Sequence, residues 1–240
     1  MNIVIPMAGR GTRFAEKGYK DPKPFINVDG MPMIEAVVKN LDVVGTYTFI
    51  CLADFWERYH QQFTSVLSRH LQRMHVVLVN SVTEGAACTI LLAKQYIDND
   101  NELILANCDQ IVMDHSPVFR AVQHFRTQNA DGGIMCFLAN ESKWSFAEVK
   151  DGKVVKVAEK DPISNLATVG IYYFKHGKDF VQSAEQMISK NIRVNNEFYT
   201  CPVFNEFIGM GKKVLPYMVN EMYGIGTPED LDIYMRRFKK

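Results

Sequence analysis

The chain has 240 residues, of which 47% are hydrophobic and 22% charged, proportions that are ordinary for a globular protein. Lys+Arg and Asp+Glu both number 27, and this neutral balance argues against a dedicated nucleic-acid-binding protein. Five scattered cysteines without a Cys-x-x-Cys pair indicate neither a zinc site nor a disulfide framework. No apolar run approaches the roughly 18 residues of a membrane helix, so we expect a cytoplasmic protein with no membrane partner.

Short apolar runs rich in β-branched residues alternate with longer amphipathic ones. The predicted strands are Asn2–Met7, Tyr47–Leu52, His75–Asn80, Glu102–Asn107, Gly133–Leu138, Ala167–Phe174 and Lys213–Val219. The predicted helices between them are Pro32–Val43, Asp54–Arg73, Gly85–Ile97, Ser116–Thr127 and Lys178–Lys190. Alternating strands and helices imply parallel pairing through right-handed crossovers. We therefore expect an α/β fold with one mostly parallel sheet and helices on both of its faces.

The stretch from Trp144 to Phe174 departs from this alternation. Its Asp151-Gly152 pair is typical of a tight hairpin turn, with strands expected at Phe146–Lys150 and Lys153–Ala158. No Pro/Gly/Ser linker and no internal repeat divides the chain. We expect residues 1–240 to form one domain, with a small antiparallel lid inserted at about 144–174.

The first predicted strand runs directly into a glycine-rich loop, residues 8–13, with the sequence Ala-Gly-Arg-Gly-Thr-Arg. Ligands of open α/β sheets bind at the carboxyl ends of the strands, and glycines there let backbone N–H groups approach phosphate oxygens. Arg10 and Arg13 add planar donors that suit phosphate. A tight turn with two solvated arginines is the alternative interpretation.

A second motif places Lys23 between Pro22 and Pro24. The prolines restrict the backbone around the lysine, so its ammonium can be aimed at a fixed point, although an ordinary proline-bounded loop has the same sequence. Together, Gly9-Arg10-Gly11-Thr12-Arg13 and Pro22-Lys23-Pro24 resemble the N-terminal signature of the sugar-phosphate nucleotidyltransferases, G-x-G-x-R followed by P-K. The resemblance implies a Rossmann-like nucleotide-binding fold of the glycosyltransferase-A type.

The same resemblance implies substrates and site residues. The substrates would be a nucleoside triphosphate and a phosphorylated small-molecule acceptor, with Mg²⁺ as cofactor. Nucleotide binding would fall to Ala8, Gly9, Arg10, Gly11, Thr12, Glu84, Gly85 and Ala86, acceptor binding to Glu159, Lys160, Gly170 and Glu197, and catalysis to Arg13 and Lys23. Each position also has an ordinary structural explanation, such as a charged hairpin end at Glu159.

Asp109 is the candidate metal ligand, because a predicted strand delivers it to the same edge of the sheet as the glycine-rich loop. Magnesium prefers one or two carboxylates together with phosphate oxygens and water. The family usually has a second metal aspartate just before a Gly-Thr-Pro turn, but here that position is Gly224. Either Glu221 reaches the ion, or water and the triphosphate complete its ligand shell.

The implied reaction joins a nucleoside triphosphate to a sugar 1-phosphate and releases pyrophosphate, supplying precursors of surface polysaccharide. A cytidylyltransferase acting on phosphocholine or another non-sugar phosphate is an alternative. Such an enzyme would need an aromatic cage, for which the candidates are Trp56, Trp144, Phe146, Tyr172 and Tyr173.

Two further functions remain open. A glycosyltransferase of the same fold usually carries Asp-x-Asp at its metal, whereas this chain reads Asn107-Cys108-Asp109. A non-catalytic nucleotide sensor is the other candidate, because Gly224 cannot ligate a metal through a side chain. The base, the acceptor and the formation of a homo-oligomer stay open at this level.

Overall fold

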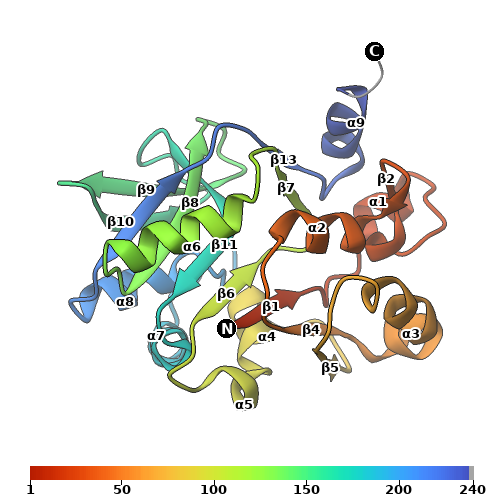
Figure 1. Ribbon diagram of the computed structural model, residues 1–240, viewed down its shortest axis with the longest axis horizontal. Coiled ribbons are helices and arrows are strands. Elements are labelled where there is room, and N and C mark those ends of the chain that lie inside the picture. The colour runs from red at the N-terminus through yellow and green to blue at the C-terminus, as the bar shows by residue number, and fades with distance from the viewer. Residues whose placement is uncertain (238–240) are drawn as a thin grey trace.

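The computed structural model describes residues 1–237, which contain a nine-stranded sheet flanked by helices (Figure 1). Its strands are β1 (Asn2–Pro6), β4 (Thr46–Leu52), β5 (Met74–Val79), β6 (Leu103–Ala106), β8 (Gly132–Leu138), β9 (Ser145–Lys150), β10 (Lys153–Glu159), β11 (Leu166–Phe174) and β12 (Val214–Met218). The strand order is β10-β9-β11-β6-β1-β4-β5, and β8 joins β12 to β11.

The helices are α1 (Thr12–Glu16), η1 (Lys23–Phe25), α2 (Met33–Leu41), α3 (Ala53–Leu67), α4 (Ala86–Leu91), α5 (Lys94–Ile97), α6 (Pro117–Thr127), α7 (Gly177–Ser189), α8 (Val203–Gly209) and α9 (Pro228–Arg236). Every predicted strand and helix is present. The predicted helix 85–97 is divided into α4 and α5, and the predicted helix 54–73 ends at Leu67. Within residues 1–237, no helix has the length and apolarity that crossing a bilayer requires.

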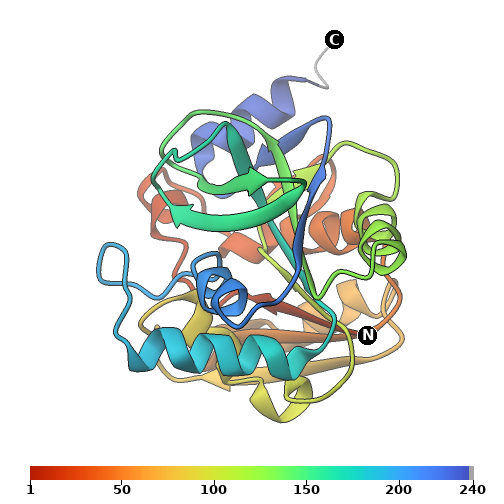
Figure 2. The ribbon, with the colours of Figure 1, turned by 90° about the vertical axis from the view of Figure 1, so that its left-hand side faces the viewer.

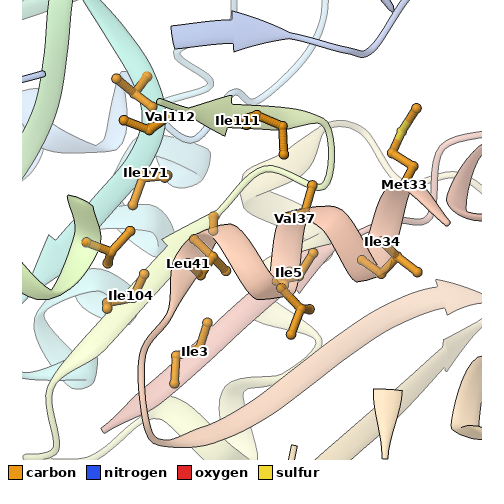
Figure 3. Close-up of a cluster of buried hydrophobic side chains, with 14 of the residues drawn as sticks. Ile3, Ile5, Met33, Ile34, Val37, Leu41, Ile104, Ile111, Val112 and Ile171 are labelled. Carbon is orange, nitrogen blue, oxygen red and sulfur yellow. The ribbon is translucent and has the colours of Figure 1, made fainter. Parts of the chain in front are cut away.

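Successive side chains of β1 are buried on opposite faces of the sheet, which explains why helices cover both faces. Ile3 and Ile5 belong to one buried cluster with α2, α3 and α6, and Figure 3 shows both side chains directed toward Val37 and Leu41 of α2. Val4, between them, belongs to a second buried cluster with α4, α7 and α8. Successive side chains of a strand point to opposite faces, so a wholly apolar strand requires cover on both sides. The expected arrangement of helices is thereby confirmed.

The central strands pair as expected. β1 is parallel to β4 and β6, and β4 is parallel to β5. β11 instead runs antiparallel to β6 and β8, a reversal that periodicity cannot predict because parallel and antiparallel strands share the same alternation. Two short antiparallel pairs complete the structure, β2 (Asn27–Val28) with β3 (Met31–Pro32) and β7 (Gln110–Val112) with β13 (Met222–Gly224).

The hairpin β9–β10 turns at Asp151 and Gly152, which have φ angles of 49° and 74°. Its strands extend the main sheet, because Phe146 of β9 pairs with Ala167 of β11. The hairpin lies at the left of the molecule in Figure 1, with α9 at the upper right, and both lie in the upper half of Figure 2. Glu159, the last residue of β10, is thereby carried toward the strand ends that bear the glycine-rich loop and Asp109.

Candidate active site

Two adjoining cavities open at the carboxyl ends of β1 and β6. The larger has a volume of about 840 Å³ and the smaller about 440 Å³. Residues that line both are Gly9, Lys23, Ala86, Asn107, Asp109, Glu197 and Tyr199. Four segments far apart in the sequence therefore meet at one edge of the sheet, as expected for ligand binding in an open α/β fold.

An ion pair lies where the two cavities meet. Lys23 opens η1, and its Nζ lies 2.6 Å from Oδ2 of Asp109, which follows β6. Burial lowers the pKa of Lys23, but the neighbouring Asp109 carboxylate outweighs this effect and holds the pKa above its ordinary value. The ammonium therefore remains charged at any physiological pH, as phosphate binding requires.

The glycine-rich loop lies against Lys23. Gly11 has a φ angle of 64°, and a Cβ there would lie 3.0 Å from Cβ of Lys23, so a side chain at this position would be both strained and crowded. Arg13, at the start of α1, lines the larger cavity. Arg10 lines neither of the two cavities and borders a third one of about 270 Å³ together with Lys20 and Arg58. The loop thus divides its two arginines between different cavities.

The predicted base-binding turn lies beside the segment that contains Glu197. Gly85 and Ala86 line the smaller cavity, and a Cβ on Gly85 would lie 2.4 Å from the carbonyl oxygen of Phe198. The amide of Phe198 also donates to the carbonyl of Glu84 over 2.8 Å. The side chain of Glu84 pairs instead with Arg193 and lines neither cavity. Gly85 is therefore needed for this close backbone approach.

The far end of the larger cavity is polar. Glu159 accepts a hydrogen bond from Ser145, and burial raises the pKa of its carboxyl above the ordinary value. Lys160 has a φ angle of 57°, and its Nζ donates to the Tyr199 hydroxyl over 2.7 Å. These residues and Glu197 line one wall, so the structure brings together three of the acceptor-binding residues predicted from the sequence.

Gly170 occupies a crowded bend of β11. Its φ angle is 80°, and a Cβ there would lie 2.1 Å from Oε1 of Gln110 and 2.4 Å from Nδ2 of Asn107. The pairing of β11 with β8 shifts register between Thr168 and Tyr172 at this bend. Gly170 lines the larger cavity and has a structural reason to be glycine that is independent of any ligand.

Glu221 lies apart from Asp109. Its carboxylate accepts a hydrogen bond from Tyr223 over 2.5 Å and pairs with Arg237, and it lines neither cavity. This placement corrects the expectation that Glu221 reaches in as a second metal ligand. Asp230 of α9 is a further carboxylate that lines the larger cavity, together with Asp109, Glu159 and Glu197.

The segment from Gly224 to Gly226 passes close to Asp109. A Cβ on Gly226 would lie 2.4 Å from Oδ2 of Asp109, and one on Gly224 would lie 3.1 Å from the ring of Trp144. Asp230 accepts hydrogen bonds from Lys143, over 3.0 Å, and from the Thr227 hydroxyl, over 2.9 Å. Among residues 1–237 no group of three or more His, Cys, Asp or Glu side chains is arranged to hold a metal ion.

Sequence reasoning missed Lys143 and Asp230 as lining residues. Asp230 stands in the Gly-Thr-Pro-Glu-Asp segment, after the position, Gly224, at which the second metal aspartate was expected. The helix α9 begins there, with the Thr227 hydroxyl accepting a hydrogen bond from the amide of Asp230. Lys143 gives no sequence signal, because a lysine in a charged loop is ordinarily solvated.

A family model described as nucleotidyl transferase matches residues 3–231. The chain belongs to this family. As a nucleotidyltransferase it transfers a nucleotidyl group from a triphosphate and releases pyrophosphate. The expectation based on the glycine-rich loop and the Pro-Lys-Pro motif is thereby confirmed.

Three similar proteins accompany the family match. The UTP–glucose-1-phosphate uridylyltransferase of Haloferax volcanii is 24% identical, over 100% of this nucleotidyltransferase and 97% of the relative. The bifunctional protein GlmU of Methanococcus aeolicus is 25% identical over 73% of the chain, which spans only 40% of that relative. A nucleoside-diphosphate-sugar pyrophosphorylase from Vibrio cholerae RC9 superposes with a TM-score of 0.84 at 25% identity, covering 98% of this chain and 99% of the other.

Proposed function

We propose that this nucleotidyltransferase condenses a nucleoside triphosphate with a sugar 1-phosphate, giving a nucleoside diphosphate sugar and pyrophosphate. The observation that carries the proposal is the placement of Lys23 and Asp109 between two adjoining cavities. The smaller cavity borders the glycine-rich loop and the Gly85 turn, and the larger extends from Gly9 and Arg13 of the same loop to Glu159 and Lys160. Two substrates bound in these cavities would meet at the ion pair.

The proposed reaction needs alignment and charge neutralisation rather than covalent participation of the protein. Arg13 and the backbone of residues 9–12 hold the β- and γ-phosphates of the triphosphate. Lys23 neutralises the α-phosphate as the acceptor phosphate attacks, and Lys160 holds that acceptor phosphate. No general base is required, because the attacking oxygen is already ionised at neutral pH.

The residues present fit a magnesium ion that takes most of its ligands from phosphate and water. Asp109 supplies one carboxylate, and the missing side chain of Gly226 leaves room beside its Oδ2. Asp230 lines the same cavity, so one or two carboxylates are available, as magnesium prefers. Held there, magnesium would neutralise part of the phosphate charge and so reduce the repulsion between the two anionic substrates.

The aromatic residues favour a sugar over a choline group. Of the candidate cage residues, only Trp144 and Tyr172 line the larger cavity. The ring of Trp144 already has Lys143 Nζ 4.7 Å from its centroid, and Lys160 Nζ lies 4.8 Å from that of Tyr199. Trp144 therefore already has a cation of the chain over its ring, and Tyr172 is buried with its hydroxyl hydrogen-bonded to that of Thr168, so neither ring is well placed to cage a quaternary ammonium.

Carboxylates at the cavity's far wall complete the argument for a sugar. Glu159 and Glu197 can accept hydrogen bonds from sugar hydroxyls. The hairpin that carries Glu159 serves as the lid over the acceptor, within a single domain. We place the reaction in the cytoplasm for surface polysaccharide supply, consistent with all five cysteines being unpaired. Assembly into a homo-oligomer remains compatible with this function.

A panel of triphosphates and phosphorylated acceptors, read out by pyrophosphate release, tests the proposal. Turnover with a sugar 1-phosphate supports it, whereas turnover only with phosphocholine or another non-sugar phosphate replaces the acceptor. Hydrolysis of a sugar nucleotide without pyrophosphate chemistry would indicate the glycosyltransferase. Tight triphosphate binding with no turnover on any acceptor would indicate the nucleotide sensor.

A further inference from the structure

A cavity of about 640 Å³ lies at the amino-terminal end of β4, which we call the distal cavity. It is lined by residues of α2, of the turn before β4 and of the segment after α3, among them Lys39, Asp42, Tyr47, Arg69, His70 and Arg73. Leu52, at the opposite end of β4, borders the third cavity beside the glycine-rich loop. The distal cavity is therefore about one strand length away from the candidate active site and shares no lining residue with it.

The distal cavity carries an excess of positive charge that ion pairs within the described part of the chain do not neutralise. Within residues 1–237, the side chains of Lys39, Arg69 and Arg73 make no ion pair. Asp42 is the one carboxylate in the lining, and its Oδ2 already accepts a hydrogen bond from the Ser116 hydroxyl over 2.9 Å. Three cations against a single carboxylate leave a local excess of positive charge in a chain whose overall charge is balanced.

His70 also lines the distal cavity, but its side chain already interacts with Glu35. Its Nε2 lies 2.7 Å from Oε1 of Glu35 on α2, which ties the segment after α3 to that helix. The free donors are therefore the two guanidinium groups and the lysine, and arginine presents a planar fork that matches phosphate oxygens.

The floor of the distal cavity is apolar and fixed in place. Val38 and Tyr47 are buried, and Leu71 is half-buried beside them. The turn at Gly45 packs closely against the start of β1, because a Cβ there would lie 2.3 Å from Cδ1 of Ile3 and 2.6 Å from the carbonyl oxygen of Met1. An apolar floor below a few convergent polar groups is the usual form of a small-molecule site.

We propose that the distal cavity binds a small phosphorylated molecule, with Arg69, Arg73 and Lys39 contacting its phosphate oxygens. This site is separate from both substrates of the proposed reaction. One helix connects the two regions, because Ile34 of α2 lines the smaller active-site cavity while Val38 and Lys39 line the distal one. A ligand in the distal cavity would thus touch the same helix that walls the nucleotide side of the active site.

Calorimetric titration with inorganic pyrophosphate, in EDTA to prevent turnover, tests the proposal. The wild-type protein should show two classes of site. The double variant Arg69→Ala/Arg73→Ala should weaken one class by at least about tenfold, the expected loss for charge-assisted contacts, and Arg13→Ala should weaken only the other class. Lys39→Ala, on a different element, should weaken the same class as the double variant.

Arg120→Ala is the matched control, because this exposed arginine of α6 lines none of the cavities described above. It should leave both classes unchanged. Turnover of the Arg69→Ala/Arg73→Ala protein should stay within about twofold of wild type, which separates loss of the site from loss of the fold. A single class of site in the wild type, or two classes that survive both Arg69→Ala/Arg73→Ala and Lys39→Ala, would overturn the proposal.

Discussion

The ammonium of Lys23 lies 2.6 Å from the carboxylate of Asp109, although 86 positions separate them in the sequence. The contact joins the Pro-Lys-Pro segment to the carboxyl end of β6. Neither side chain is fully buried, with exposed fractions of 20% and 25%. Both charged groups therefore remain accessible to an anionic substrate and to a cation that arrives with it.

Replacing Lys23 by alanine should lower turnover by roughly 100- to 1000-fold, the usual cost of removing one group that stabilises charge in the transition state. Pyrophosphate release at saturating substrates measures this. Lys20→Ala is the matched control, because that lysine lines only the third cavity and should change turnover by less than threefold. A Lys23→Ala protein that stays folded and works within a few-fold of wild type would contradict the role given to Lys23.

The two arginines of the glycine-rich loop should behave differently. Arg13 lines the larger active-site cavity, whereas Arg10 borders only the third cavity. Arg13→Ala should therefore reduce kcat/KM for the triphosphate by about 100-fold, and Arg10→Ala by only a few-fold. Steady-state kinetics with the triphosphate as the varied substrate would measure kcat/KM for both variants. Equal losses in the two variants would contradict the different roles given to Arg10 and Arg13.

Magnesium dependence should distinguish three carboxylates. Asp109→Asn should raise the Mg²⁺ concentration needed for half-maximal turnover by more than about tenfold, and Asp230→Asn should have a smaller effect in the same direction. Glu221→Gln should leave it unchanged, because Glu221 pairs with Arg237 outside the cavity. Direct titration with Mn²⁺, followed by electron paramagnetic resonance, provides a second measurement that does not depend on activity.

The buried carboxyl of Glu159 should make stability depend on pH. Burial raises its pKa above the ordinary value of 4.5, so the folded protein keeps this proton to a higher pH than the unfolded chain. The free energy of unfolding should therefore fall as the pH rises from 4.5 through the raised value. Glu159→Gln should flatten this decline in urea denaturation series.

Glu148→Gln on the same hairpin is the control for this pH effect. The ion pair with Lys150 lowers the pKa of the half-exposed Glu148 carboxyl, which gives a contribution of opposite sign that is lost as the pH falls. This variant should not flatten the decline above pH 4.5. If Glu159→Gln and Glu148→Gln show identical slopes, the decline has another origin.

Two glycines with the same backbone conformation should differ in their tolerance of alanine. Gly152 and Gly170 have φ angles of 74° and 80°, but a Cβ meets nothing within 4 Å at Gly152 and crowds Gln110 and Asn107 at Gly170. Gly152→Ala should cost about 1–2 kcal/mol in the free energy of unfolding, from backbone strain alone. Gly170→Ala should cost a further ~1–3 kcal/mol from overpacking, which chemical denaturation of both variants would resolve.

The regular part of the fold could be predicted because its signal is local. The apolar runs of β1 and β6, buried on both faces, identify strands without reference to the rest of the chain. The direction of β11 could not be predicted, since strand polarity depends on where the preceding hairpin docks. The short strands β7 and β13 also gave no signal, because three residues each are too few to establish a period.

For the candidate site, the motifs identified several of the residues that line the cavities, but they did not predict all of the contacts that these residues make. Lys23 and Asp109 were each singled out, and both were expected at one rim of the sheet, where the structure places them. The separation of Arg10 from Arg13 depends on the conformation of Gly11, which a repeating pattern of glycine and arginine does not specify. Asp230 could not be distinguished from an ordinary helix-capping aspartate, because its position beside the cavity depends on how α9 packs.

The contact between Gly85 and the backbone of Phe198 has a consequence for how the two substrates bind. With no room for even one methyl group between them, the turn that lines the smaller cavity and the segment that carries Glu197 should move together as a single piece. Holding this piece in one position restricts its motion as a body, and whichever substrate binds first meets that entropic cost for the second. Affinity for each substrate should accordingly rise in the presence of the other, by the same factor in both directions.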